Sequence, residues 1–236
     1  MKKIKVVLWD FDGTLLDSTR ESMENMIFIA EKLGLRAPSV EILQKYWGMP
    51  WLEFLDEVAR ECKWQKGIKG KFLDKCRENK HLWRSHKLFE GTNNTLKILI
   101  SKKIKVGIVS SRVKESVGKD LFSIMDYFKK LEINTNMFFI IQGREDCSYV
   151  KPNPRVLDSV IEILRKDGIG LDEIVYVGDT IHDFNTASKH IPKISFVAVV
   201  SGACDSVIFL QEKVSPECII DSPAGIFESI KFLENL

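Results

Sequence analysis

The sequence lacks the features that mark membrane and nucleic-acid-binding proteins. It has no apolar run near the roughly 20 residues that a membrane-spanning helix needs, and its first apolar run stops at Asp10, too early for a secretory signal. The 35 lysines and arginines nearly balance the 33 aspartates and glutamates, which leaves a net charge of +2. We therefore expect neither a membrane nor nucleic acid as a partner.

Paired cysteines are also missing. The five cysteines are odd in number, scattered and without a CxxC pair, which predicts reduced thiols in a cytoplasmic protein rather than disulfides or a zinc site. The chain has no internal repeat, low-complexity segment or long Pro/Ser/Gly linker. Its 236 residues suffice for one large domain, or for a domain with a smaller companion.

Short β-rich runs alternate with helical patterns along most of the chain. The expected strands are 4–9, 105–109, 138–142, 174–177, 194–200 and 218–220. The expected helices between them are 92–101, 114–122, 154–166 and 224–233. Continuous apolar strands that alternate with helices are typical of a parallel sheet covered on both faces. The predicted fold class is therefore α/β.

The stretch from about residue 17 to residue 88 interrupts this alternation. Its pattern is almost entirely helical, without a convincing strand, and it holds four of the five tryptophans. Ser18 and Glu21 have the spacing of a capping box for a helix that ends near Gly34. Ser39 is a candidate cap for a second helix. We predict a helical insertion with short junctions, which suits a hinged lid, and we favour a small hydrophobic core over an aromatic ligand cage for its tryptophans.

Polar residues follow the strands at the points where they end. Because parallel strands have their carboxyl ends at one edge of the sheet, these residues should lie close together. The residues at this edge are Asp10 and Asp12 after the first strand, Ser110, Ser111 and Arg112 after the second, Asp179 and Asp183 after IVYV, and Lys151 in KPNP.

Such an acidic cluster needs a cation. Two unit charges about 4 Å apart interact by roughly 4 kcal/mol at an effective dielectric constant near 20, and a hard divalent ion with oxygen ligands relieves that repulsion. Mg²⁺ is the best match. With Lys151 nearby, an anionic substrate is favoured, and an ionised aspartate can attack phosphorus to form an acyl phosphate. A second aspartate can exchange protons with the leaving oxygen and with water.

The set DFDGT, IVSS, KPNP and VGDTxxD resembles the motifs of the haloacid dehalogenase superfamily of phosphohydrolases. It is similar to the branch with a helical cap after the first motif, the phosphoglycolate-phosphatase-like and β-phosphoglucomutase-like group, over nearly the whole chain. The resemblance implies a Rossmann-like parallel-sheet core formed by residues 1–16 and 89–236, with an α-helical cap domain at 17–88.

The resemblance also implies roles for the first two motifs. Asp10 would be the nucleophile and a metal ligand. Asp12 would be the general acid and base and would offer its backbone carbonyl to Mg²⁺. Ser110 would bind the phosphoryl group, and Ser111 is a further candidate for substrate contact.

The later motifs complete the implied site. Lys151 would neutralise charge on the substrate, and Asp179 would bind the metal. Asp183 would be a metal ligand or its support, although it has an equally good position to cap the following helix. For Arg112 we favour a surface salt bridge over substrate contact.

Two segments depart from the family pattern. Motif II continues as Ser110-Ser111-Arg112 where the phosphatase branch often has Thr-Asn, and the stretch before Lys151 differs from the usual short form. Both departures concern the choice of substrate and leave the phosphoryl chemistry untouched.

The sequence thus predicts a Mg²⁺-dependent phosphatase that hydrolyses a small phosphorylated metabolite through an aspartyl-phosphate on Asp10. The alternatives are a phosphomutase of the β-phosphoglucomutase type and, ranked lower, a non-catalytic binding module. Phosphoglycolate, a sugar phosphate, pyrophosphate and a nucleotide all remain open as substrates, and so does the oligomeric state.

Overall fold

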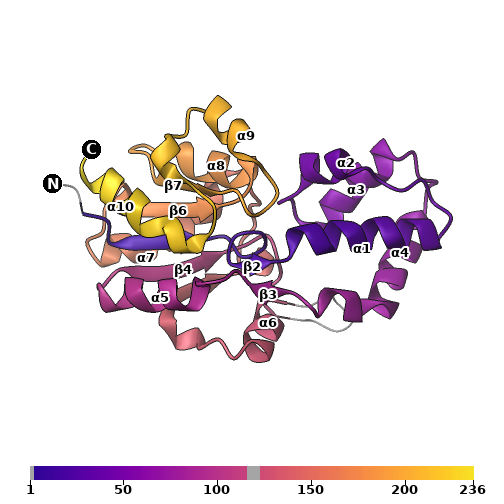
Figure 1. The fold of residues 1–236 in the computed structure, drawn as a ribbon, viewed down its shortest axis with the longest axis horizontal. Coiled ribbons are helices and arrows are strands. Elements are labelled where there is room, and N and C mark those ends of the chain that lie inside the picture. Colours follow the sequence, from indigo (N-terminus) through magenta and orange to yellow (C-terminus); the bar gives the residue numbers. More distant parts are fainter. Residues whose placement is uncertain (1–2, 116–122) are drawn as a thin grey trace.

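A computed structural model describes residues 3–115 and 123–236 (Figure 1). Its centre is a six-stranded sheet in the order β5-β4-β1-β6-β7-β8, in which every pair of neighbours is parallel. The strands are β1 (Val6–Trp9), β4 (Lys105–Val109), β5 (Phe138–Gln142), β6 (Ile174–Gly178), β7 (Ser195–Val199) and β8 (Ile219–Ile220). All six predicted strands are present with ends within two residues, and the α/β class is confirmed.

The helices of the sheet domain follow from apolar spacing and from caps. They are α5 (Thr92–Ser101), α6 (Ile124–Lys130), α7 (Asp158–Lys166), α8 (Ile181–Ser188), α9 (Ser206–Gln211) and α10 (Ile226–Glu234). Short 3-10 helices connect them: η2 (Thr135–Met137), η3 (Arg144–Asp146), η4 (Pro154–Leu157), η5 (Leu171–Glu173), η6 (Pro216–Cys218) and η7 (Pro223–Gly225). Strand β1 is fully buried because helices cover the sheet.

Three of the four helix predictions hold, with adjustments at the ends. The helix at 92–101 is confirmed as α5, whereas the pattern at 154–166 divides into η4 and α7, and the pattern at 224–233 into η7 and α10. Of the helix predicted at 114–122, residues 116–122 lie outside the described residues, and the two residues before them are not helical.

Four α-helices lie between β1 and the remainder of the sheet domain. They are α1 (Thr19–Lys32), α2 (Val40–Tyr46), α3 (Trp51–Glu61) and α4 (Ile68–Glu78), followed by the 3-10 helix η1 (Lys80–Trp83). We call residues 19–83 the helical segment. It packs around its own hydrophobic cluster, distinct from that of the sheet domain, with Trp83 buried in it and Trp47, Trp51 and Trp64 packed against it. The tryptophans therefore do form a small core, as we favoured.

Two short strands flank the helical segment, although the sequence pattern predicted none there. Strand β2 (Leu16–Asp17) pairs with β3 (Lys87–Leu88) in an antiparallel ladder. Each strand has only two residues, too few for an alternating pattern to appear in the sequence. The ladder brings the two ends of the helical segment together (Figure 1).

The predicted capping box at the start of α1 is wrong. The Ser18 side chain does not cap the helix; its hydroxyl donates a hydrogen bond to Asp12 Oδ1 at 2.8 Å. Glu21 instead accepts a hydrogen bond from the Ser85 hydroxyl. The Ser18 hydroxyl thus donates to a charged acceptor and accepts no bond from the first backbone amides of α1. The predicted stop at Gly34 holds, with a φ of 65°, and Ser39 caps α2 by accepting from the Ile42 amide.

The five cysteines are free thiols. None of the helices among residues 3–115 and 123–236 has both the length and the apolar character that crossing a membrane requires.

Candidate active site

Three carboxylates converge at the carboxyl edge of the sheet. Asp10 follows β1, Asp179 follows β6, and Asp183 lies in the first turn of α8. One oxygen from each lies within 4.8 Å of the others, and all three residues are buried. The strand ends thus bring together the acidic residues that the sequence singled out.

Lys151 lies between two of these carboxylates. Its Nζ donates to Asp10 Oδ1 and to Asp183 Oδ1, both at 2.7 Å, and the residue is 3% exposed. Burial lowers the pKa of Lys151, but the charges of Asp10 and Asp183 outweigh it and raise this pKa well above its ordinary value. Lys151 is therefore a permanent cation inside the site.

One lysine does not offset three carboxylates. Burial raises the pKa of Asp10 to about 7; Lys151 opposes the shift, and Asp183 adds to it. Burial, together with the charges of Asp183 and Asp10, raises the pKa of Asp179 well above its ordinary value. A buried group of oxygen donors with excess negative charge fits a hard divalent cation such as Mg²⁺.

Asp183 uses both of its oxygens within the protein. Oδ2 accepts from the Thr180 amide at 3.1 Å and from the Thr180 hydroxyl at 2.5 Å, completing a capping box at the start of α8. Oδ1 accepts from Lys151 and from the Tyr176 hydroxyl at 3.3 Å. The capping alternative is therefore confirmed, and Asp183 also remains a member of the acidic cluster.

The Asp179 side chain accepts fewer hydrogen bonds than that of Asp183. Its Oδ1 accepts from the Thr14 hydroxyl at 3.2 Å, and its Oδ2 accepts from the Ala203 amide at 2.8 Å. Gly13 makes this approach possible, because a Cβ built there would lie 2.1 Å from Asp179 Oδ2. With a φ of 73°, this position also favours glycine on backbone grounds.

Asp12 lies outside the acidic cluster and binds Arg112. Asp12 Oδ2 accepts from Arg112 Nε at 2.6 Å, and Asp12 Oδ1 accepts from Arg112 Nη2 at 2.7 Å. The salt bridge that we favoured for Arg112 is present, but it does not lie at the surface, because the Arg112 side chain is only 17% exposed and its guanidinium lies 5.2 Å from the centre of the Tyr127 ring. Burial raises the pKa of Asp12, but the charge and hydrogen bonds of Arg112 hold it below its ordinary value.

The two serines after β4 have different partners. Ser110 is buried, and its Oγ accepts from the Arg112 amide at 3.1 Å. The Ser111 hydroxyl donates to the Gly48 carbonyl of the helical segment at 2.8 Å. Ser111 therefore joins the sheet edge to the helical segment, a role that sequence reasoning missed.

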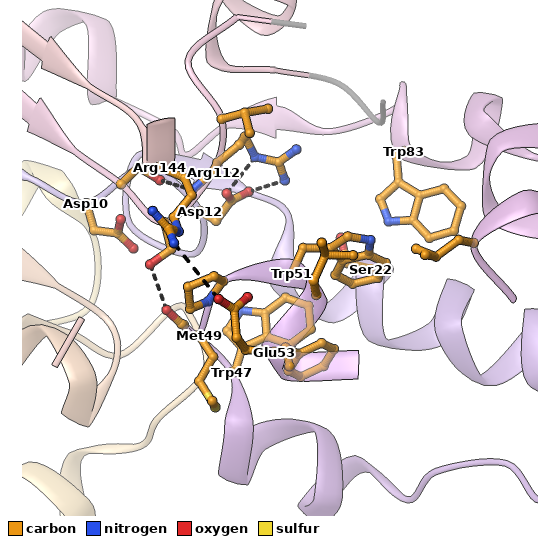
Figure 2. A pocket seen from close by; sticks show the side chains of 18 of the residues that line it. Asp10, Asp12, Ser22, Trp47, Met49, Trp51, Glu53, Trp83, Arg112 and Arg144 are labelled. Atoms are coloured by element: carbon orange, nitrogen blue, oxygen red, sulfur yellow. Dashed lines mark hydrogen bonds and ion pairs between the residues drawn. The ribbon is translucent and has the colours of Figure 1, made fainter. Parts of the chain in front are cut away.

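A cavity of about 510 Å³ separates the sheet edge from the helical segment. Asp10, Asp12, Ser110, Ser111 and Arg112 line it on the sheet side. Val113 and Arg144 also line it, and residues of the helical segment form the rest of the wall. Figure 2 shows Asp10 and Asp12 on one side of the cavity and Trp83 on the other. The tryptophans thus border the site as well as forming a core, which no spacing in the sequence indicated.

Comparisons with known proteins identify the family of this chain. The family model described as haloacid dehalogenase-like hydrolase matches residues 7–199. A protein of Caldanaerobacter subterraneus subsp. tengcongensis assigned as the pyrophosphatase PpaX is 28% identical over 78% of this chain and 77% of its own. A phosphoglycolate phosphatase of Aquifex aeolicus is 26% identical over 79% of this chain and 81% of its own.

The fold has a counterpart among solved structures. The crystal structure of a Bacteroides fragilis protein, assigned as a haloacid dehalogenase-like hydrolase, covers 93% of this chain and 98% of its own with a TM-score of 0.73 and 25% identity. Family model, curated relatives and solved structure agree, and the chain belongs to the haloacid dehalogenase-like hydrolases.

Proposed function

We propose that this hydrolase is a Mg²⁺-dependent phosphatase that cleaves a small phosphomonoester through an aspartyl-phosphate on Asp10. One observation carries the proposal: Asp10 lines the cavity while its carboxylate contacts Lys151 inside the acidic cluster. A carboxylate placed beside a cation and open to a cavity can receive an anionic phosphoryl group. The phosphatase and pyrophosphatase assignments of the relatives support the reaction class.

In the first half-reaction, an Asp10 oxygen attacks phosphorus and the bond from phosphorus to the ester oxygen breaks. Asp12 gives the leaving oxygen its proton. In the second half-reaction, a water attacks the phosphorus of the aspartyl-phosphate, Asp12 accepts the proton of that water, and the Asp10 carboxylate is restored. Lys151 and the Ser110 hydroxyl hold the phosphoryl oxygens, since both lie at the same strand-end edge.

Mg²⁺ would be held by the carboxylates of Asp10 and Asp179 and by the backbone carbonyl of Asp12, with Asp183 in support. When bound, it neutralises the negative charge that the phosphoryl group adds to the site.

The helical segment acts as the cap of this active site in our proposal, with the core formed by residues 1–16 and 89–236 and the cap by 17–88. Several hydrogen bonds join them, among them Ser111 to the Gly48 carbonyl at 2.8 Å, Gln44 Nε2 to the Ala203 carbonyl at 3.2 Å, and the Tyr127 hydroxyl to the Trp83 carbonyl. A cap that closes over the cavity excludes bulk water from the reacting groups.

The test is phosphate release from a panel of small phosphomonoesters, with Mg²⁺ and with EDTA, by the wild-type chain and by Asp10→Asn. We expect release that requires Mg²⁺ and that Asp10→Asn abolishes while it keeps the wild-type circular dichroism spectrum, since an amide cannot act as the nucleophile. Turnover near the wild-type level in Asp10→Asn would overturn the mechanism. Accumulation of a sugar bisphosphate in place of released phosphate would identify the phosphomutase instead.

A further inference from the structure

The cavity is far larger than a phosphoryl group requires. Its volume of about 510 Å³ lies within the range of roughly 300 to 1,000 Å³ that accommodates drug-sized ligands. A phosphoryl group with a two-carbon acid, or a second phosphoryl group, would fill only a fraction of it. The remaining space must hold either water or a larger leaving group.

The wall of the cavity that the helical segment forms is mostly apolar and aromatic. It includes Trp47, Met49, Trp51, Leu73 and Trp83, with the polar side chains of Ser22, Glu53 and Arg77 among them. Figure 2 shows the Trp47, Trp51 and Trp83 rings spread along the cavity away from Asp10. Such a surface is poorly suited to ordered water and well suited to a flat apolar group.

Two of these rings are fixed in place by Phe54. Trp51 stacks on Phe54 with centroids 5.7 Å apart, and Trp47 meets Phe54 edge-on at 5.4 Å. Both tryptophans are only half-buried. Because packing holds the rings, an aromatic ligand would find its surface already formed, which lowers the entropy cost of binding.

The arginines that line the cavity already have carboxylate partners. Arg112 binds Asp12 at 2.6 Å, Arg77 binds Asp74 at 2.8 Å, and Arg144 lies 4.0 Å from Glu53. A second anionic group on the substrate would compete with these carboxylates for the arginines, or would enter the apolar part of the cavity unpaired, which is costly. The lining therefore disfavours pyrophosphate and phosphoglycolate, although relatives carry the names of enzymes for both.

We infer that the substrate is a phosphomonoester with a bulky, uncharged, aromatic leaving group that packs against Trp47, Trp51 and Trp83. This inference rests on the proposed phosphatase activity. The phosphoryl group lies at Asp10 and Lys151, and the ring occupies the apolar part of the cavity.

The test compares ethyl phosphate with 2-phenylethyl phosphate. Both are primary alkyl esters with similar leaving oxygens, so they differ in the ring and not in the chemistry at phosphorus. We expect kcat/KM to be at least about tenfold higher for the phenyl ester, because burial of the ring removes apolar surface from water. Phosphoglycolate and pyrophosphate should fall below the phenyl ester.

Substitutions of single tryptophans test where in the cavity the phenyl ring binds. Trp51→Leu and Trp47→Leu should each reduce the preference for the phenyl ester at least about fivefold. Trp64→Leu should leave the preference unchanged, since Trp64 is equally half-buried and packs on Phe72 at 5.0 Å but does not line the cavity. Binding of both esters to Asp10→Asn, followed by tryptophan fluorescence, gives the same comparison without turnover.

The possible outcomes distinguish the proposed substrate class from the proposed phosphatase activity. Hydrolysis of both esters at equal kcat/KM, or a preference for phosphoglycolate or pyrophosphate, would overturn the substrate class and leave the phosphatase standing. Absence of turnover for every ester would overturn the phosphatase. Equal affinity of Asp10→Asn for the two esters would overturn the aromatic site by itself.

Discussion

Arg112 binds both oxygens of Asp12, with Nε 2.6 Å from Oδ2 and Nη2 2.7 Å from Oδ1. The Ser18 hydroxyl adds a third hydrogen bond to the same carboxylate. These contacts hold the pKa of Asp12 below its ordinary value against the opposing effect of burial. Asp12 is therefore ionised before the substrate binds, which is the form that accepts a proton from water in the second half-reaction we propose. To donate to the leaving oxygen in the first half-reaction, Asp12 must first take a proton from the phosphoryl group of the bound substrate monoanion.

The first prediction concerns this ion pair. Arg112→Met should raise the pKa of Asp12, so the acidic limb of the kcat profile should move to higher pH and kcat should fall about tenfold to a hundredfold. The measurement is kcat from about pH 4 to about pH 9. Arg144→Met is the matched control, because Arg144 also lines the cavity and faces a carboxylate, that of Glu53. An acidic limb that stays in place in Arg112→Met would contradict the role of Arg112.

The second prediction separates Asp179 from Asp183. Asp179 accepts only from the Thr14 hydroxyl and the Ala203 amide among the hydrogen bonds described for its side chain, so Asp179→Asn should raise the Mg²⁺ concentration for half-maximal activity at least about tenfold. Asp183 is bound by Thr180, Lys151 and Tyr176. Asp183→Asn should therefore act mainly on stability, lowering the free energy of unfolding by about 3 kcal/mol, since it weakens a buried ion pair.

Mg²⁺ titrations of activity and urea denaturation of both variants provide the measurement. Similar effects of the two substitutions on the Mg²⁺ requirement, with no difference in stability, would show that the hydrogen bonds of Asp183 do not set its role.

The third prediction links stability, pH and Mg²⁺. Burial raises the pKa of Asp10 from 3.8 to about 7, and that of Asp179 also lies above its ordinary value. Between about pH 4 and about pH 7 the folded metal-free protein thus holds protons that the unfolded chain has released. The stability that these groups contribute is present at low pH and is lost as the pH rises through this window.

Mg²⁺ competes with those protons, so it should stabilise the protein more at high pH. We expect saturating Mg²⁺ to raise the Tm at least about 3 °C more at about pH 8 than at about pH 5.5. Thermal unfolding with Mg²⁺ and with EDTA at both pH values measures this, with Asp179→Asn as the control that should lose most of the difference. An equal rise in Tm at both pH values would exclude the acidic cluster as the Mg²⁺ site.

The acidic cluster could be predicted from the sequence because topology places it. Asp10 and Asp179 directly follow parallel strands, and such strands end at a common edge whatever their order in the sheet. Lys151 was predicted at that edge from its place in KPNP, and it contacts Asp10 there. Apolar runs likewise predicted the six strands, because the four central ones, β4, β1, β6 and β7, are buried along nearly their whole length.

The sequence could not predict which of several possible partners a polar side chain binds in the folded protein. Ser18 had a capping position in the sequence, yet its hydroxyl binds Asp12, which only the folded chain brings within reach. Arg112 looked like a surface residue because nothing local to it shows that Asp12 lies opposite. The aromatic wall was missed for the same reason: its tryptophans have a core role in the helical segment and a second role only where that segment meets the sheet edge.

The fourth prediction concerns Gly48, at the contact between the helical segment and the sheet edge. Its carbonyl accepts from Ser111, its φ is 91°, and a Cβ built there would lie 3.0 Å from Thr180 Oγ1. Gly48→Ala therefore combines backbone strain with a contact that pushes the helical segment away from the core. Gly67 is a close match in conformation, with a φ of 88°, but a Cβ there would meet nothing within 4 Å.

Both substitutions should reduce stability to a similar extent, by about 1 kcal/mol, because both force an alanine into the left-handed region. Only Gly48→Ala should also raise KM, by about fivefold or more. The added methyl group would meet the Thr180 side chain when the helical segment closes over the cavity. Steady-state kinetics with one phosphomonoester and urea denaturation of both variants separate strain from closure. If Gly67→Ala raises KM as much as Gly48→Ala, the kinetic effect comes from backbone strain within the helical segment, and the contact with Thr180 does not govern closure.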